Sequence, residues 1–299
     1  MPLSPAAVGV TTDPVVHDID SRWLMAYAAS VGATGPAYLD TRRGAGIGSH
    51  PVFPVALEWP AVLALRDRFA AAGLTRDEAA RGVHLTHDLA VHRPVRPGDR
   101  LRTTATVEAL RGHRAGTLAV LGLHTVDDEA EPVATSTMGT LYRGVAPSED
   151  LPSDDDGTDA VRRGDEAAPP DGGDSLEFTV DIAAGAAHVY TECSRIWNPI
   201  HTDARTAARA GLPGIILHGT ATLAWAVTGL IDRLADGDPG GVSRLACRFA
   251  SPVIMPTRLL VSASIEPDTS PSGEGRWVGF TVTGPDGAAV LRHGLIRLA

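Results

Sequence analysis

A short stretch in the second half of the chain contains the residues best suited to acid–base chemistry. The sequence YTECSRIWNPIHTDARTA begins at Tyr190 and places His201 three residues after Asn198. Proline fixes its own φ and keeps the residue before it out of the helical region, so the chain must turn at Asn198-Pro199. A helix that ends near Ser194 is then followed by a loop that holds the histidine. Because imidazole titrates near neutral pH, the pattern favours proton transfer.

This stretch resembles the signature of the MaoC-like (R)-specific enoyl-CoA hydratases and dehydratases. That signature is a tyrosine, a few residues, Gly-Asp-x-Asn-Pro-aliphatic-His, and then five residues and a small side chain. Two positions depart from it, because Ile196 stands where the family has its catalytic aspartate and Arg195 stands where it has a glycine. The residues that match in register are Tyr190, Asn198, Pro199, Ile200, His201 and Ala207.

The resemblance implies addition of water across, or its removal from, the α,β double bond of an acyl thioester. In this interpretation His201 moves the proton and Asn198 holds the loop or the imidazole in place. The missing aspartate would have shared the water and the proton transfers with the histidine. Glu192 is our candidate for its replacement, because Asp203 is better explained as the cap of the next helix.

The apolar segment that follows, IILHGTATLAWA from Ile215, supplies the expected substrate-binding residues. A backbone N–H where this helix starts, at His218-Gly219, can stabilise the enolate-like oxygen, and glycine allows the thioester to approach closely. Tyr190 and Ile196 complete the expected substrate-binding set. His218 itself is better explained as a structural partner of the helix start than as a catalyst.

Three other histidines suggest a metal site, but their spacing argues against it. His84, His87 and His92 lie on an expected strand, and residues three apart on a strand face opposite sides. We therefore expect no metal ligands here, and the pattern implies no cofactor. Cys193 lies in an expected helix, and no base stands at a spacing that would activate its thiol, so we interpret it as a packing residue.

The elements around these residues occur twice. Tyr27 is followed by Gly35-Pro36 at the spacing that separates Tyr190 from Asn198-Pro199. PVRPGDRL from Pro94 likewise matches PVIMPTRL, with the two motifs in the same order in both halves. Two such matches indicate a tandem duplication. The first half carries a tyrosine where the second has its histidine and lacks a His-Gly at the start of its long helix, so we expect it to be non-catalytic and to form half of an acyl-binding groove.

Each half reads as a long helix followed by consecutive strands, which predicts an α+β protein with an antiparallel sheet wrapped around each helix. This is the hotdog fold that the resemblance also implies, so two copies make a double hotdog. We expect residues 1–147 to form the first hotdog and 175–299 the second, catalytic one. The two domains should pack side by side through their sheets without forming a single continuous sheet.

Residues 148–174 contain ten acidic side chains against two arginines and are rich in glycine and proline. Such a segment buries too little apolar surface to offset its ordering entropy, so it reads as a flexible linker. It holds most of the net charge of −10, and the remainder of the chain is close to neutral, which argues against a nucleic-acid partner. No apolar run reaches the roughly 20 residues of a membrane span.

The sequence leaves three classes of function open. The first is a hydratase or dehydratase acting on a CoA-bound or carrier-protein-bound acyl chain. The second is a hotdog protein that binds an acyl thioester or polyketide-like ligand without turnover, and the third is an isomerase or cyclase. A thioesterase fits the loop pattern less well. Two cysteines give no disulfide framework, so we expect a cytoplasmic protein, with a homodimer as one candidate assembly.

Overall fold

The computed structural model describes residues 3–147, 151–153, 174–265 and 275–299. In the first half the long helix is α3 (Pro54–Ala71), and four long strands follow it in sequence. The strands are β2 (Gly82–Val91), β3 (Arg100–His113), β4 (Gly116–Val126) and β5 (Pro132–Arg143). The elements that precede or flank α3 are η1 (Pro5–Ala7), β1 (Val15–Asp18), α1 (Ser21–Ser30), α2 (Pro36–Leu39) and α4 (Arg76–Ala79).

The second half repeats this order around α7 (Gly219–Leu234). Before that helix come β6 (Asp174–Ile182), α5 (Ala186–Ser194), η2 (Pro199–His201), α6 (Ala204–Arg209) and β7 (Ile216–Leu217). After it come η3 (Pro239–Gly241), β8 (Val242–Phe249), β9 (Val253–Ile254), β10 (Thr257–Ile265), β11 (Arg276–Thr283) and β12 (Ala289–Leu298).

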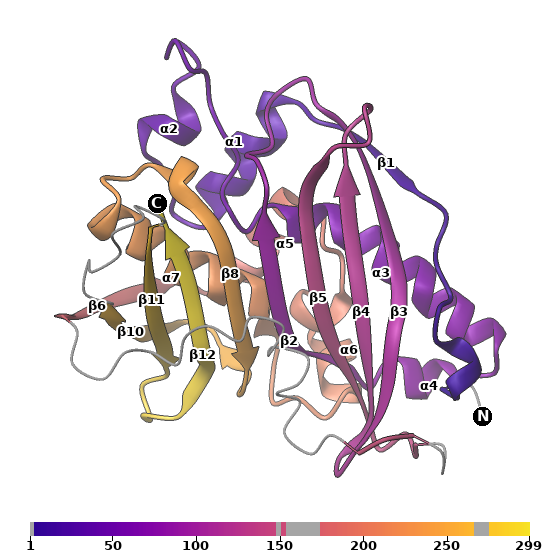
Figure 1. The fold of residues 1–299 in the computed structure, drawn as a ribbon. Coiled ribbons are helices and arrows are strands. Elements are labelled where there is room, and N and C mark those ends of the chain that lie inside the picture. The colour runs from indigo at the N-terminus through magenta and orange to yellow at the C-terminus, as the bar shows by residue number, and fades with distance from the viewer. Residues whose placement is uncertain (1–2, 148–150, 154–173, 266–274) are drawn as a thin grey trace.

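Within the described residues, ten strands form one antiparallel sheet in the order β1-β3-β4-β5-β2-β8-β12-β11-β10-β6, and β7 pairs with β9 in a separate two-stranded sheet. The halves join where β2 pairs with β8, with His87 opposite Cys247. The expectation of two separate sheets is therefore wrong. Each half has an edge strand with free N–H and C=O groups, and pairing the two edges satisfies both. Figure 1 shows the strands on one side of the molecule, with α3 and α7 behind them.

Both long helices are buried against this sheet. The side of α7 that meets β6 carries Gly229, where an added Cβ would come within 2.2 Å of the Phe178 ring. Glycine at this position lets the helix approach the strand closely. Leu223, Val227 and Leu230 on α7 are fully buried in the same core. The long apolar helix of each half therefore packs against the strands of its own half.

The internal duplication places matching residues in contact. Tyr27 on α1 and Tyr190 on α5 are completely buried, and their hydroxyl oxygens lie 3.3 Å apart. These are the two tyrosines that the sequence aligned, and α1 packs against α5 where they meet. The two halves therefore meet at equivalent residues in this contact, in addition to joining through the β2–β8 pairing.

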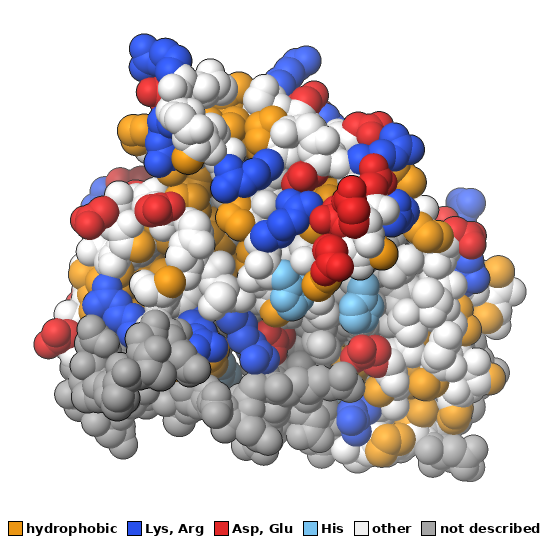
Figure 2. Space-filling view, turned by 45° about the horizontal axis from the view of Figure 1, so that its top comes forward, with side chains coloured by type: hydrophobic (Ala, Val, Ile, Leu, Met, Phe, Trp, Pro, Cys, Tyr) orange, Lys and Arg blue, Asp and Glu red, His pale blue; other side chains and the backbone are white. Residues whose placement is uncertain are grey.

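Several local predictions can be compared with the structure. Asp203 caps α6, since its Oδ1 accepts a hydrogen bond from the Thr206 N–H at 2.7 Å, and Gly211 beyond the helix has φ +75°. The predicted linker lies outside the described residues apart from 151–153 and 174. No helix within the described ranges is long and apolar enough to cross a membrane. Figure 2 shows basic and acidic side chains intermixed on one face.

Candidate functional site

The Asn-Pro-Ile-His turn holds His201 as the sequence predicted. Pro199 opens the short helix η2, and the Asn198 Oδ1 accepts a hydrogen bond from the Ile200 N–H at 3.4 Å. The His201 N–H donates to the Asn198 carbonyl at 3.1 Å, which closes the turn. Asn198 therefore holds the loop. The His201 side chain is 8% exposed, so the turn presents the imidazole to a largely desolvated environment.

One hydrogen bond defines which nitrogen of His201 can act as a base. Its Nδ1 lies 2.8 Å from the Ile216 carbonyl oxygen, which can only accept, so Nδ1 carries the proton. In the neutral ring Nε2 then has a free lone pair. Burial lowers the pKa of His201 to about 4, against the opposing effect of the bond to Ile216. The ring is therefore neutral near pH 7, with Nε2 ready to take a proton.

His218 stacks on His201, with ring centroids 3.6 Å apart and planes inclined by 22°. Its Nε2 lies 3.3 Å from both the Ile196 carbonyl and the Thr191 hydroxyl, so Nε2 carries the proton. Its Nδ1 is buried and has no hydrogen-bond partner within the described structure. Burial, together with the neighbouring His201, lowers the pKa of His218 well below its usual value. Two stacked neutral imidazoles thus face the start of α7.

The first turn of α7 supplies backbone donors beside these rings. His218 is the N-cap residue, and the N–H groups of the first turn have no acceptor within the helix. The Tyr190 hydroxyl donates to the Thr220 Oγ1 at 3.1 Å and so ties α5 to this turn. The Phe249 ring packs directly on Gly219, where an added Cβ would approach to 2.9 Å. The structure thus gathers Tyr190, His218 and Gly219 around the helix start.

The two positions that depart from the signature have clear structural roles. Ile196 is 6% exposed and belongs to the main core, while its carbonyl orients His218. Arg195 adopts φ +61°, the left-handed conformation at the end of α5 that suits glycine. Its guanidinium lies 3.8 Å from the centroid of the Trp23 ring, a cation–π contact. The backbone of the turn is therefore kept, but the carboxylate is not.

Glu192 does not replace the missing aspartate in this arrangement. Its side chain is exposed on α5, whereas Tyr190 and Thr191 of the same helix point inward. Asp203 is engaged as the cap of α6. Across residues 174–265 and the other described ranges, no ion pair or hydrogen bond joins a carboxylate to His201. The hypothesis that Glu192 shares the proton transfer therefore finds no support in the geometry.

The first half contains a matching ring pair that the sequence analysis missed. Tyr38 on α2 occupies the place of His201, and its ring stacks with that of His50 at 5.9 Å. His50 is fully buried, and both its nitrogens are used: Nδ1 accepts from the Val52 N–H and Nε2 lies 3.2 Å from the Thr228 hydroxyl. His50 lies four residues before the start of α3, so the first half has no His-Gly at its helix start. With no free nitrogen, it is a structural histidine.

The expectation that His84 and His87 face opposite sides of their strand is wrong. Their ring centroids are 5.2 Å apart, because the pairing of β2 with β5 shifts register between His84 and Thr86. Such a bulge adds a residue and turns both side chains to one face. His92 lies elsewhere, 2.9 Å from the Thr135 hydroxyl. Within the described residues, no group of three or more His, Cys, Asp or Glu side chains could hold a metal ion.

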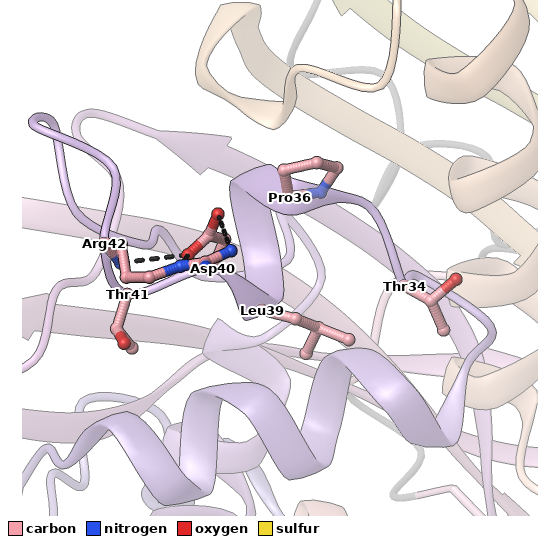
Figure 3. A pocket seen from close by; sticks show the side chains of 6 residues that line it. All are labelled: Thr34, Pro36, Leu39, Asp40, Thr41 and Arg42. Carbon is pink, nitrogen blue, oxygen red and sulfur yellow. Dashed lines mark hydrogen bonds and ion pairs between the residues drawn. The ribbon is translucent and has the colours of Figure 1, made fainter.

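A surface hollow beside α2 holds no comparable chemistry. Figure 3 shows its six lining residues. The one ion pair among these six joins Arg42 to Asp40, with Arg42 Nε 2.8 Å from Asp40 Oδ1. Arg42 also lowers the pKa of that carboxyl. The hollow lies on the half in which Tyr38 replaces the histidine. The residues suited to proton transfer are therefore at α5, η2 and α7.

Comparison with known proteins shows what each half of the chain resembles. Residues 169–272 match the MaoC like domain, and residues 6–136 match the FAS1-like dehydratase domain region. The two models match different halves of the chain, and each covers less than half of it. Over 260 residues it is 28% identical to the 3-hydroxyacyl-thioester dehydratase Y of Mycobacterium tuberculosis, covering 85% of this chain and 84% of that protein. It is 36% identical over 81 residues to an enoyl-CoA hydratase of the same organism, 27% of this chain and 28% of that one.

Solved structures that resemble this chain show its fold. A MaoC-like dehydratase from Phytophthora capsici superimposes with a TM-score of 0.77 at 20% identity, covering 98% of this chain and 96% of that one. A Mycobacterium tuberculosis protein described as having a double hotdog fold gives a TM-score of 0.62 at 17% identity, over 97% and 96% of the two chains. The prediction of an α+β double hotdog is confirmed.

Proposed function

We propose that this MaoC-like protein hydrates the α,β double bond of an enoyl thioester and catalyses the reverse dehydration of the 3-hydroxyacyl thioester. The observation that carries the proposal is the neutral His201, whose Nε2 is free because Nδ1 donates to Ile216. This base lies beside the first turn of α7, whose N–H groups are available. The matches to the dehydratase domain models, and the activities for which the similar proteins are named, support the same reaction.

In the dehydration direction, Nε2 of His201 removes the α-proton of the 3-hydroxyacyl thioester. The electrons move onto the carbonyl oxygen, where the Gly219 N–H at the positive end of α7 stabilises the developing charge. As the enolate collapses, the C–O bond at the β-carbon breaks and the imidazolium returns its proton to the departing hydroxyl. One base thus takes the proton from carbon and delivers it to the water that leaves.

The reverse sequence gives hydration with the same atoms. Nε2 takes a proton from water as its oxygen attacks the β-carbon, and the same nitrogen then protonates the α-carbon. His218 supports this cycle as a positioning residue, because it stacks on His201 and is itself oriented by the Ile196 carbonyl. A single-base cycle replaces the two-residue mechanism because Ile196 supplies no carboxylate.

No carboxylate among the described residues is bonded to His201, and this favours one alternative function. A single base with an oxyanion donor also suffices to bring the double bond of a 3-enoyl thioester into conjugation, by taking an α-proton and returning it to the γ-carbon. The second candidate function is therefore an enoyl-thioester isomerase. Incubation with crotonyl-CoA and with trans-3-hexenoyl-CoA, followed by mass analysis and by measurement of the absorbance of the conjugated enoyl thioester, separates the two. A product heavier by one water supports hydration, and a conjugated product of unchanged mass supports isomerisation.

Three finer features also remain proposals. We expect the acyl group to be bound to CoA or to an acyl-carrier protein, and the protein to act in the cytoplasm, as the two free cysteines suggest. A homodimer is the assembly that we propose. Light scattering on the purified chain would measure the assembly, and a monomer at assay concentrations would contradict it.

A further inference from the structure

A second group of buried polar side chains lies in the first half, on the face of the sheet that meets α3. Glu58 of α3 is 3% exposed, and His87 of β2 is 1% exposed. The Ser136 hydroxyl donates to Glu58 Oε1, and Glu58 Oε2 lies 3.7 Å from His87 Nε2. Thr140 on β5 pairs with His84, so it adjoins the same group. We call Glu58, His84, His87, Ser136 and Thr140 the α3 polar cluster.

The cluster contains hydrogen-bonding capacity that the protein does not use. Neither nitrogen of His87 has a hydrogen-bond partner within the described structure, and the Thr140 hydroxyl is likewise buried and unpartnered. A buried polar group without a hydrogen bond costs about 1–3 kcal/mol, so a folded protein rarely keeps several together. A neutral imidazole offers one donor and one acceptor, and a hydroxyl offers both. The cluster is therefore equipped to receive a group that both donates and accepts.

The charge state of the cluster favours an uncharged guest. Burial lowers the pKa of His87 to about 4, so this ring is neutral near pH 7. Burial raises the pKa of Glu58 to about 7, against the effect of the Ser136 hydrogen bond, so its carboxyl is readily protonated. An ionic guest would have to lose its hydration in this interior, at a much larger cost than a hydroxyl or ketone.

A continuous series of ring contacts links the cluster to the proposed active site. The Phe249 ring packs on Gly219 at the start of α7, and its centroid lies 4.8 Å from that of His84. His84 in turn lies 5.2 Å from His87. His84 and Phe249 are partly exposed whereas Glu58 and His87 are buried, so the partly exposed end of the cluster is the end nearest the start of α7. An acyl chain that extends from a thioester at Gly219 past Phe249 would meet the histidines first.

We propose that the α3 polar cluster binds an oxygen substituent, a hydroxyl or a ketone, carried by the substrate's acyl chain at a position remote from the thioester. This inference rests on the proposed function, because it takes the thioester to lie at Gly219. It makes the substrate an oxygenated acyl thioester and assigns Glu58 and His87 as specificity-determining residues. It also explains why the half without the catalytic histidine keeps buried polar side chains where a plain alkyl chain would favour leucine or valine.

Binding of saturated acyl-CoAs tests the proposal without requiring turnover. The probes are octanoyl-CoA and its 6-hydroxy and 8-hydroxy derivatives, measured by isothermal titration calorimetry on the full chain. Wild-type protein should bind at least one hydroxylated probe about tenfold more tightly than octanoyl-CoA, the value of one well-made hydrogen bond. Equal affinity for all three probes would overturn the proposal, whatever the variants do.

Two variants and a matched control locate the effect. His87→Leu and Glu58→Leu should each bring the three affinities to within about twofold of one another. Thr125→Val removes a buried hydroxyl of the same half, one that pairs with Thr103 outside the cluster, and should keep the preference. Because His87 makes no hydrogen bond, its leucine variant should keep the wild-type Tm. If it does not fold, His87→Met serves, because it fills similar space without a strong hydrogen-bonding group, and a preference that survives in folded variants would refute the assignment.

Hydration of crotonyl-CoA, which has no remote substituent, separates this inference from the proposed function. Wild type and His87→Leu should hydrate it equally. Loss of the hydroxyl preference with crotonyl-CoA turnover intact is the expected outcome for the variants. A wild type that hydrates crotonyl-CoA but does not distinguish the probes would contradict the cluster's role alone. A wild type that distinguishes the probes but hydrates nothing would contradict the proposed function alone.

Discussion

The acid side of the pH–rate profile depends on the pKa of His201. Burial lowers that pKa to about 4, so the ring stays neutral well below pH 7. At pH 5.5 a histidine with a pKa near 4 is about 97% neutral, whereas an unperturbed one with a pKa near 6.5 is only about 10% neutral. If neutral His201 is the base, kcat/KM for crotonyl-CoA should change by less than about 10% between pH 7.5 and pH 5.5.

The assay follows the loss of enoyl-thioester absorbance after a rapid jump of pH, so that each rate is read before the protein unfolds. Stability must be tracked separately, because the unfolded state binds more protons than the folded state between pH 4 and pH 6.5. The free energy of unfolding therefore falls as the pH drops through this range, by about 3 kcal/mol for His201 alone at its lower end. A tenfold loss of kcat/KM centred near pH 6.5, with the circular dichroism unchanged, would refute the assignment of a buried neutral base.

Two further predictions concern the motif aspartate that Ile196 replaces and the close packing between the halves. Ile196→Asp should raise the rate of crotonyl-CoA hydration at least tenfold, because a second proton-transfer group typically contributes about 10²-fold or more. Glu192→Gln should stay within twofold of the wild-type rate. The opposite pattern would mean that Glu192 serves the site. Gly32→Ala should lower the free energy of unfolding, measured in urea, by about 1–3 kcal/mol more than Gly211→Ala. Both glycines have φ near +75°, but only at Gly32 would an added Cβ come within 2.3 Å of the Trp225 ring. Equal losses of stability would contradict that contact.

The sequence predicted those parts of the fold that depend on local signals. The turn at Asn198-Pro199 and the cap at Asp203 both follow from the local preferences of single residues. The sequence indicated the duplication because Tyr27 and Tyr190 occupy equivalent positions in the two halves. Their direct contact in the structure shows that the match reflects packing as well as ancestry.

Other features depend on contacts between distant segments and left no local signal. The join of β2 to β8 is a choice between two edges, and nothing in either strand alone specifies it. The convergence of His84 on His87 depends on a register shift that is set by the pairing with β5. His50 was missed because its ring partner Tyr38 and its hydrogen-bond partner Thr228 come from separate parts of the chain.

The candidate site was predicted in part for the same reason. His201, His218, Gly219 and Tyr190 fall together because one turn and one helix start position all four. Glu192 was chosen by its nearness in sequence, but the helical period turns it outward while Tyr190 and Thr191 turn inward. Nearness in sequence is thus a poor guide on a helix unless the facing side is known.

The most direct test of the account is the hydration of crotonyl-CoA by wild type and by His201→Asn. Asparagine can keep the hydrogen bond to the Ile216 carbonyl but has no basic nitrogen, so the fold and Tm should be retained. The account predicts that kcat falls by about 10²–10⁴-fold while KM changes little, because the base is lost and the thioester site at α7 is kept. A folded His201→Asn protein that turns over crotonyl-CoA at the wild-type rate would contradict the central claim.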